Sequence, residues 1–594
     1  MKTIKFIYSF ITGLLRSRVH RVQYILFVAT VTGITSGLIA VLLKTLVHYL
    51  QDWITTIPVS RFSFLLFPVS GLVLTVLIVR KLFKGHIEKG ISMVLKAIAR
   101  KNSFIPLSHT YLHVLTSSVT VGLGGSVGLE APIVATGSAV GSNVARISDL
   151  HYRERTLLIA CGAASGIAAV FNAPIAGVIF AIEILLTETI VSYFIPLIIS
   201  AAIGALCSAI ILQESILFNF TLQQNFNYNN VPFYILLGIL AGFVSLYYAR
   251  LFKKVEHGMQ HLKMNPYMRA MSGGFLLLGM YILLPPLFGE GYDSIKLLAN
   301  GRPFEISDNT SILSNLSGEW AILIFTGLVV LTKPIAAGIT IGSGGNGGNF
   351  APSLFTGAYL GYFFSRIIST TGWFRLPESN FTLVGMAGVL SGVMYCPLTA
   401  IFLIAEITRG YALFIPLMIV SSISYFIVKH YEPFSLDTKQ YALEGQIFTH
   451  KKDQNILSSI KIEDILEDEA ATILQNSDYH QLELMLRDKQ FAVIAVVSSN
   501  NDFTGIIEMQ DLQSNWHEQF STEDSTIEQL TKKAEFIQYT DPMPVIIKRF
   551  DATKKWYLPV VNEHHKFLGF VSQNKLFLKY RTILSEQNDL YETI

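Results

Sequence analysis

Two short runs of the chain combine glycine and proline with residues suited to holding a negatively charged ligand. The first, Gly128–Gly141, reads GLEAPIVATGSAVG and carries the acidic residue Glu130. The second, Gly348–Gly361, reads GNFAPSLFTGAYLG. Each run predicts a glycine-rich loop that leads into a helix with proline in its first turn, where proline is well tolerated. A helix N-terminus carries about half a positive charge and several unpaired N–H donors, so two such termini facing each other form an anion site.

Ionisable residues are scarce around these two runs. Glu130 is the only acidic residue within positions 89–148, and Lys333 is the only charged residue within 321–365. A carboxylate at membrane depth is costly and marks a functional site, although Glu130 could also serve only to complement a helix dipole. A full positive charge would bind an anion too tightly for release, whereas the partial charges of helix termini suit passage.

The composition places both runs in a membrane. The chain has 594 residues, of which 51% are hydrophobic and 15% charged, and its mean hydropathy is +0.46. Soluble chains average about 25% charged residues, so a solvated surface along the whole length is excluded. The cysteines Cys161, Cys207 and Cys396 have neither metal-ligand spacing nor the pattern of a disulfide framework. The net charge of +3 argues neither for nor against a nucleic-acid partner, and we expect none.

The distribution of charge divides the chain into three zones. Residues 1–22 are basic and contain no acidic residue, which predicts a cytoplasmic N-terminus. Residues 23–440 are a transmembrane domain of apolar runs, several of them shorter than the ~20 residues that a spanning helix needs. Residues 450–594 are rich in charge and predict a small cytoplasmic α/β domain. The apolar runs are Tyr24–Leu43, Phe62–Val79, Phe194–Leu212, Val231–Tyr248, Gly273–Phe288, Ala321–Leu331 and Phe414–Val428, and the glycine and proline breaks are Gly122–Pro132, Pro174–Gly177, Pro334–Pro352 and Pro397.

The transmembrane domain contains an internal repeat. The run Gly162–Glu183 aligns without a gap with Gly385–Glu406, so that the two glutamates meet. The two runs that carry glycine and proline align at nearly the same offset, which makes Glu130 the counterpart of Phe350. Two collinear matches indicate a duplication rather than chance. Repeats with interrupted short helices in corresponding places predict a transport site at the interface between the repeats.

These residues resemble the CLC family of chloride channels and proton-coupled chloride transporters. The resemblance rests on GLEAP at Gly128–Pro132, on GNGGNFAP at Gly345–Pro352, on FNAPIAG at Phe171–Gly177 and on PLTAIFLIAE at Pro397–Glu406. It implies an all-α polytopic membrane fold with an inverted internal repeat, and a homodimer with one pore in each subunit. It also implies that Glu130 is the gating glutamate and that the backbone of Asn349 and Phe350 contributes to the central anion site.

Four positions depart from the family's pattern. His86 stands in place of an anion-contacting serine in the loop Gly85–Gly90, and Ser435 stands in place of the central-gate tyrosine, with Asp437 close by. Ile184 occupies the position of the proton-relaying glutamate of the family's exchangers, and an isoleucine carries no proton. Leu129 replaces a basic residue beside Glu130, and Ala131 replaces a glycine at the outer anion site.

The tail resembles a tandem pair of CBS domains, with repeats over Ile462–Leu512 and Ala534–Leu576. Such pairs hold ribose and phosphate with a Ser or Thr followed three residues later by Asp. The first repeat keeps Asp511 but has Glu508, which repels phosphate, and the second keeps Ser572 but has Lys575. We expect adenine nucleotide to bind weakly or not at all, and a purely structural dimerising tail is the alternative. A helix is predicted over Asp478–Asp488, and strands over Phe491–Val497, Gly505–Ile507, Pro544–Ile547, Tyr557–Val561 and Phe567–Val571.

Three functions remain open from the sequence. The first is passive, gated conduction of chloride or another small anion, in the plasma membrane and with both termini cytoplasmic. The second is proton-coupled chloride exchange, and the third is a membrane sensor that has lost transport and uses its tail. An enzyme is not expected, because the run Ala163–Gly166 is explained by packing of small residues between helices and the sequence has no HExxH motif. Apart from the nucleotide, neither a cofactor nor a metal is predicted.

Overall fold

A computed structural model of the chain describes residues 20–56, 66–83, 90–100, 103–186, 194–212, 226–307, 319–372, 374–439, 457, 460–467, 469–488, 491–510 and 527–589. The chain folds into two compact units, residues 1–440 and 441–594. Helices make up the regular structure of the first unit throughout its described residues. Their order is α2 (Arg21–Thr56), α4 (Phe67–Leu82), α5 (Gly90–Arg100), α6 (Ser108–Gly122), α7 (Glu130–Ile147), α8 (Tyr152–Phe171), α9 (Pro174–Phe180), η1 (Ala181–Leu185), α10 (Phe194–Leu212), η3 (Tyr228–Asn230), α11 (Val231–Gln260), α12 (Pro266–Leu283), η4 (Pro285–Leu287), α13 (Tyr292–Ala299), α14 (Phe304–Ser307), α15 (Glu319–Gly342), α16 (Phe350–Thr370), α17 (Glu378–Met394), α18 (Pro397–Ile407) and α19 (Phe414–Tyr431).

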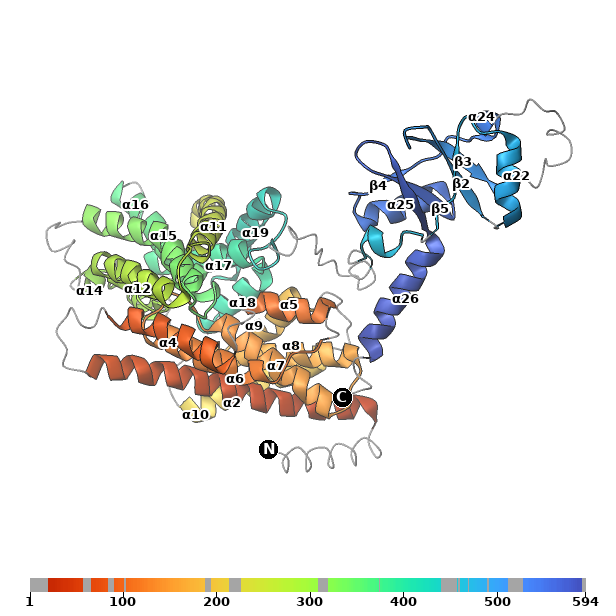
Figure 1. Cartoon of the computed structure of the whole chain (residues 1–594). Helices are drawn as coiled ribbons and strands as arrows, with labels where there is room; N and C mark the ends of the chain where they lie inside the picture. The colour runs from red at the N-terminus through yellow and green to blue at the C-terminus, as the bar shows by residue number, and fades with distance from the viewer. Residues whose placement is uncertain are drawn as a thin grey trace. The chain divides into compact units, whose positions relative to one another are not determined.

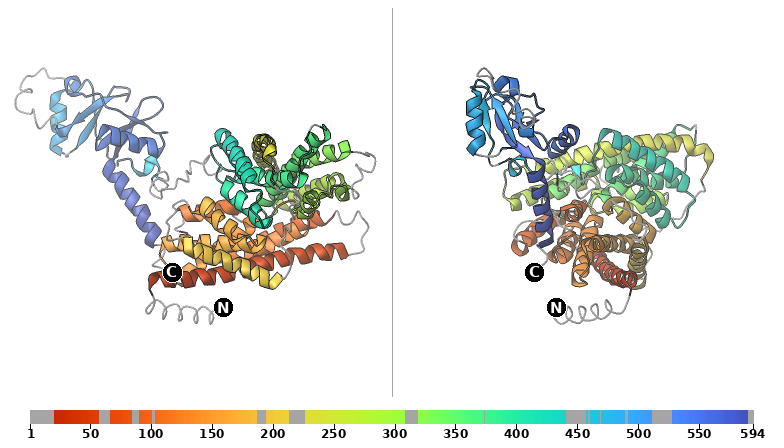
Figure 2. Two further views of the ribbon diagram at one scale, coloured as in Figure 1. Left: turned by 180° about the vertical axis from the view of Figure 1, so that it is seen from behind. Right: turned by 90° about the vertical axis from the view of Figure 1, so that its right-hand side faces the viewer.

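The second half of this unit repeats the packing of the first. Helix α7 packs along α8 as α16 packs along α17, and α10 packs on α2 as α19 packs on α11. Figures 1 and 2 show the two halves as two layers, with α2–α10 in one and α11–α19 in the other. The predicted all-α membrane fold with an inverted internal repeat is therefore confirmed.

Glycines at equivalent positions permit the closest helix crossings in both halves. A side chain on Gly137 of α7 would overlap the backbone oxygen of Gly162 on α8. The equivalent pair in the second half is Gly357 on α16 and Gly385 on α17, with the same overlap. Small residues let the backbones of membrane helices approach closely, which gains van der Waals contact where no hydrophobic driving force acts between helices.

Six described helical segments are long and apolar enough to cross a membrane. They are Arg21–Ile54, Tyr152–Phe171, Phe194–Leu212, Tyr228–Gln260, Trp320–Gly342 and Phe414–Tyr431. Large apolar side chains such as Leu206, Phe243 and Phe275 lie exposed on the outside of the unit, as expected of a surface that lipid covers. One predicted break is misplaced, because α15 continues through Pro334 to Gly342 and the interruption is confined to residues 343–349. Neighbouring helices can compensate for the hydrogen bond that proline removes.

The second unit contains two similar motifs, each with a three-stranded sheet. In the first, β1 (Thr472–Leu474) pairs parallel with β2 (Val493–Val497), which pairs antiparallel with β3 (Phe503–Glu508). In the second, β4 (Ile537–Gln538), β5 (Tyr557–Val561) and β6 (Phe567–Ser572) repeat this order and these directions. The helices are η6 (Ile462–Asp464), α22 (Tyr479–Asp488), α24 (Ile527–Leu530), α25 (Met543–Thr553) and α26 (Gln573–Asp589).

The predicted small α/β tail is confirmed, but one of its predicted strands is wrong. Residues Pro544–Ile547 lie in helix α25, with Pro544 in the first helical turn. Proline lacks an N–H, and the first turn of a helix has no intrahelical partner for one, so the turn favours proline. The predicted helix and the other four predicted strands correspond to α22, β2, β3, β5 and β6.

Candidate functional site

A pair of backbone hydrogen bonds joins the two predicted anion-binding loops. The N–H of Gly128 donates to the oxygen of Gly348 at 3.0 Å, and the N–H of Gly348 donates to the oxygen of Gly128 at 2.9 Å. The pairing is antiparallel. Because the two glycines are equivalent in the repeat, an approximate twofold axis passes between them. A side chain on Gly128 would clash with Glu130 and Ala351, and one on Gly348 would clash with the buried Ala131.

Helices α7 and α16 begin two residues after this pair, at Glu130 and Phe350. The Glu130 side chain is 1% exposed and reaches across to the other half of the molecule. The N–H of Ala351, in the first turn of α16, donates to Glu130 Oε2 at 3.4 Å. The hydroxyl of Tyr292, at the start of α13, donates to Glu130 Oε1. The N–H of Glu130 also donates to its own carboxylate, so donors of both halves hold it.

The loop before α13 supplies a second acidic side chain, which sequence analysis missed. Glu290 accepts a hydrogen bond from the N–H of Leu129, the residue before Glu130, at 3.1 Å. The only sequence signal was its position between two glycines, in Gly289–Gly291, within an apolar region.

Lys333 of α15 is fully buried beneath the same loop. Its Nζ donates to Ser126 Oγ at 2.9 Å and to the oxygen of Gly289 at 3.1 Å, and it lies 4.4 Å from the centre of the Phe355 ring. Burial of an ammonium group is costly unless it is hydrogen-bonded. These contacts satisfy it and fix the loop.

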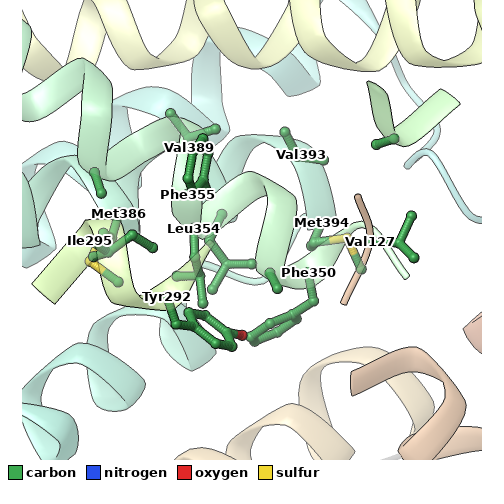
Figure 3. Close-up of a cluster of buried hydrophobic side chains, with 14 of the residues drawn as sticks. Val127, Tyr292, Ile295, Phe350, Leu354, Phe355, Met386, Val389, Val393 and Met394 are labelled. Atoms are coloured by element: carbon green, nitrogen blue, oxygen red, sulfur yellow. The ribbon is translucent and has the colours of Figure 1, made fainter. Parts of the chain in front are cut away.

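The start of α16 is packed from the opposite side by aromatic residues. The hydroxyl of Tyr248, in α11, donates a hydrogen bond to Asn349 Oδ1 at 3.1 Å. The Phe350 ring is 1% exposed and lies 5.7 Å from Phe171 and 6.3 Å from Phe180, centre to centre. In Figure 3 the hydroxyl end of Tyr292 points toward the Phe350 ring.

Polar contacts across the repeat interface are reciprocal. Thr340 Oγ1 accepts from the N–H of Ser126 at 3.2 Å, and Thr120 Oγ1 accepts from the N–H of Asn346 at 3.1 Å. Each threonine lies near the end of the helix that precedes the loop of its own half, and the N–H that it binds belongs to the loop of the other half. The two loops are therefore positioned by the opposite repeat.

Ile184 lies in the single π-helical turn η1 that follows α9. Its side chain is partly buried and packs against the core of the unit. The preceding carboxylate, Glu183, accepts hydrogen bonds from the N–H of Leu398 at 3.1 Å and the N–H of Thr399 at 2.8 Å. No side chain that can carry a proton occupies position 184, and Glu183 is engaged at the N-terminus of α18.

The remaining predicted residues of the anion pathway either have hydrogen-bond partners in other segments or lie outside the described residues. Ser435 Oγ pairs with Thr438 Oγ1 at 3.0 Å in the turns after α19. Asp437 accepts a hydrogen bond from Ser92 of α5 at 3.3 Å. His86 lies outside the residues that the structure describes.

The predicted nucleotide residues of the tail are only partly described. Ser572 is buried, and its hydroxyl donates a hydrogen bond to the carboxylate of Glu467. The same Oγ accepts a hydrogen bond from the N–H of Lys575 at 3.1 Å. Glu508 forms an ion pair with Lys555 at 2.7 Å, so its charge is balanced within the tail. Asp511 lies outside the described residues.

Comparison with known proteins gives a consistent result. A family model described as voltage gated chloride channel matches residues 71–429. The putative chloride channel protein ClcB-like of Ralstonia nicotianae is 26% identical over 419 residues, which cover 67% of this chain and 92% of that protein.

Two solved structures have the same fold. A slow cyanobacterial Cl⁻/H⁺ antiporter is 20% identical with a TM-score of 0.61, covering 72% of this chain and 98% of that one. A eukaryotic CLC transporter is 17% identical with a TM-score of 0.61, covering 95% of this chain and 98% of that one. Because the family model covers more than half of the chain, the chain belongs to the CLC family of voltage-gated chloride channels.

Proposed function

We propose that this protein moves chloride across a membrane and that Glu130 is the gate of the pathway. The observation that carries this proposal is the position of the Glu130 carboxylate, which accepts hydrogen bonds from the N-terminus of α16 and from Tyr292. A carboxylate in this position is an anion attached to the protein, and it occupies the place that a free chloride ion would take. Displacing it leaves N–H and O–H donors to which a chloride ion can bind.

Helix termini and neutral donors provide the attraction in this proposal. The backbone of Asn349 and Phe350 offers a second position for the anion at the start of α16, and Ala131 lines the start of α7. Partial charges bind an anion weakly enough for it to move on. Lys333 adds a full charge, and its ammonium group donates to Ser126 and to the oxygen of Gly289 in the loop before α13.

Passive conduction is the form of transport that we propose. Ile184 has no proton to transfer, and the neighbouring Glu183 accepts three hydrogen bonds at the N-terminus of α18, which hold it in place. The alternative is proton-coupled exchange, which is the activity stated for the cyanobacterial antiporter of similar fold. A membrane sensor without transport is a further alternative.

We propose a homodimer in the plasma membrane, with both termini cytoplasmic. Helices α9, α10, α18 and α19 form one side of the unit, where α9 packs against both α10 and α18. Exposed apolar residues occupy equivalent positions of the two repeats on this side: Ile175 and Leu398, Ile195 and Ile415, Ile198 and Met418. A self-complementary apolar face of this kind suits a twofold dimer.

For the tail we propose a structural, CBS-like role with weak adenine nucleotide binding through Asp511 and Ser572.

Reconstitution of the full chain into vesicles tests the proposal. Vesicles loaded with chloride are diluted into chloride-poor buffer, and external chloride and pH are recorded together. Chloride efflux without proton movement supports passive conduction, and a chloride gradient that drives steady proton transport contradicts it in favour of exchange. Absence of any flux, with protein verified in the membrane, contradicts transport and leaves the sensor.

A further inference from the structure

Among the described residues, Tyr292 is the one whose side-chain hydroxyl donates a hydrogen bond to the Glu130 carboxylate. It is the first residue of α13 and is 6% exposed. Together with the N–H of Ala351, 3.4 Å from the other carboxylate oxygen, it supplies donors to both oxygens of Glu130. Both donors belong to the second repeat, whereas Glu130 belongs to the first.

We propose that Tyr292 is a ligand of the transported anion. Its hydroxyl donates to Glu130 while the carboxylate occupies the position in front of α16, and to the anion once the carboxylate has left. This inference rests on the proposed function, because it assumes that an anion replaces the carboxylate.

The loop before Tyr292 keeps the hydroxyl in place when Glu130 leaves. Gly291 has a φ of 84°, in the left-handed region that favours glycine, and a side chain there would clash with the ring of Phe355. The Lys333 ammonium group donates to the backbone oxygen of Gly289 at 3.1 Å and lies over the same Phe355 ring. The loop is thus tied to α15 and α16 independently of Glu130.

Departure of the carboxylate opens the position in front of this hydroxyl to another acceptor. A buried donor is stabilised by a hydrogen-bond acceptor, so an anion that enters this position gains a hydrogen bond from Tyr292. A phenol donates a hydrogen bond without a net charge. It therefore attracts an anion without the strong binding that a lysine or arginine would impose.

The charged groups around this position increase the importance of a hydroxyl donor for anion binding. Glu290 faces Glu130 from the loop before α13 and repels an anion, while Lys333 of α15 and Lys44 of α2 counter the charge of Glu290. The N–H of Leu129 is already bound to Glu290 at 3.1 Å, so it is not available to an anion. The donors that remain for a bound anion are the N–H of Ala351, the hydroxyl of Tyr292 and the N–H of Glu130 itself.

Anion affinity without the gate is the direct test. We would titrate purified full-length Glu130→Ala with bromide and chloride by calorimetry, and compare it with Glu130→Ala/Tyr292→Phe. Loss of one hydrogen bond to a charged partner is expected to weaken halide binding by about tenfold or more. The control is Glu130→Ala/Tyr281→Phe. Tyr281 is also buried, but its hydroxyl donates to the oxygen of Gly124 at 2.8 Å, so halide affinity should be unchanged.

The possible outcomes separate this inference from the proposed function. If Glu130→Ala binds halide and the additional Tyr292→Phe change has no effect, the inference is wrong and chloride transport stands. If neither the wild type nor Glu130→Ala binds halide or conducts it, the proposed function fails as well. Should Tyr292→Phe fail to fold, a crystal structure of Glu130→Ala with bromide decides. Anomalous density within hydrogen-bonding distance of Tyr292 Oη supports the inference, and bromide density elsewhere contradicts it.

Discussion

Glu183 and Glu406 bind each other's helices across the repeat interface. Glu183 accepts from the N–H groups of Leu398 and Thr399, at the start of α18. Glu406 lies in α18 and accepts from the N–H groups of Ile175 at 3.0 Å and Ala176 at 2.7 Å, at the start of α9. A carboxylate at a helix N-terminus pairs with unsatisfied donors and with the positive end of the helix dipole. The two glutamates that the repeat alignment pairs thus make equivalent contacts in the two halves.

Neutralising either glutamate should therefore destabilise the protein to a similar extent. We expect Glu183→Gln and Glu406→Gln each to lower the free energy of unfolding by about 1 kcal/mol, because each weakens charge-assisted hydrogen bonds. Thermal unfolding in detergent, followed by intrinsic fluorescence, measures this. Chloride flux should persist in both variants. Loss of proton movement in Glu183→Gln alone, with flux kept, would instead identify Glu183 as a proton carrier.

Glu130→Gln should give chloride flux that no longer varies with external pH. The amide keeps the size of the side chain but removes the charge that competes with the anion, and the amide does not titrate. Flux into vesicles across a series of external pH values measures this. Glu378→Gln is a suitable control, since its carboxylate lies at the start of α17, not of α7 or α16, and pairs with Arg366 at 2.7 Å. A pH dependence equal to that of the wild type would exclude Glu130 as the gate.

Asn349→Ala should reduce stability more than anion affinity. Its backbone, not its amide, faces the proposed anion, and the side chain serves as acceptor for the buried hydroxyl of Tyr248. Leaving that hydroxyl unpaired costs about 1–3 kcal/mol, whereas removing both partners is nearly neutral. Thermal unfolding should thus show Asn349→Ala/Tyr248→Phe to be closer to the wild type than Asn349→Ala alone. Strictly additive losses would show that the two side chains do not interact.

The ion pairs of Glu432 should stabilise the protein in a pH-dependent manner. Partial burial disfavours its ionisation, but hydrogen bonds from Lys439 at 2.6 Å and Arg250 at 2.9 Å outweigh this and lower the pKa of the carboxyl. A lowered pKa means that the contribution is complete above the value of an unfolded glutamate, about 4.3, and is lost as the pH falls further.

Glu432→Gln should accordingly unfold at a lower temperature than the wild type at pH 7. Both cations are partly exposed, so the free energy of unfolding should differ by less than about 1 kcal/mol between the two proteins. In acid, below the lowered pKa of Glu432, the two unfolding temperatures should converge. An equal difference at both pH values would mean that the charge of Glu432 contributes nothing.

The tail should bind ATP weakly or not at all. Ser572 is engaged with Glu467, and the Lys555 ammonium group is engaged with Glu508. A phosphate would have to break one or both of these interactions. Calorimetry of the full chain with ATP and Mg²⁺, compared with a chain ending at residue 440, measures this. Saturable binding in the micromolar range that the shorter chain lacks would contradict the prediction.

The parts of the fold that the sequence predicted are those with local signals. The starts of α7 and α16 follow from glycine and proline within a few residues, and the repeat follows from direct alignment. Tyr292 and Glu290 were missed because their partners are distant in the sequence. Tyr292 lies 162 residues from Glu130, and no periodicity or spacing links the two. Lys333 was noted as an isolated charge, but its partners in the loop before α13 emerge only when the chain folds.

The reciprocal contacts of the two halves also determine how the protein can be assembled. Residues 20–212 alone would leave Ser126, Gly128 and the start of α9 without the partners that the second half supplies. Each half is thus comparable to one subunit of an obligate heterodimer whose subunits happen to share one chain. Cutting the connection within residues 213–225 should be tolerated when both fragments are made together, and either fragment made alone should be degraded.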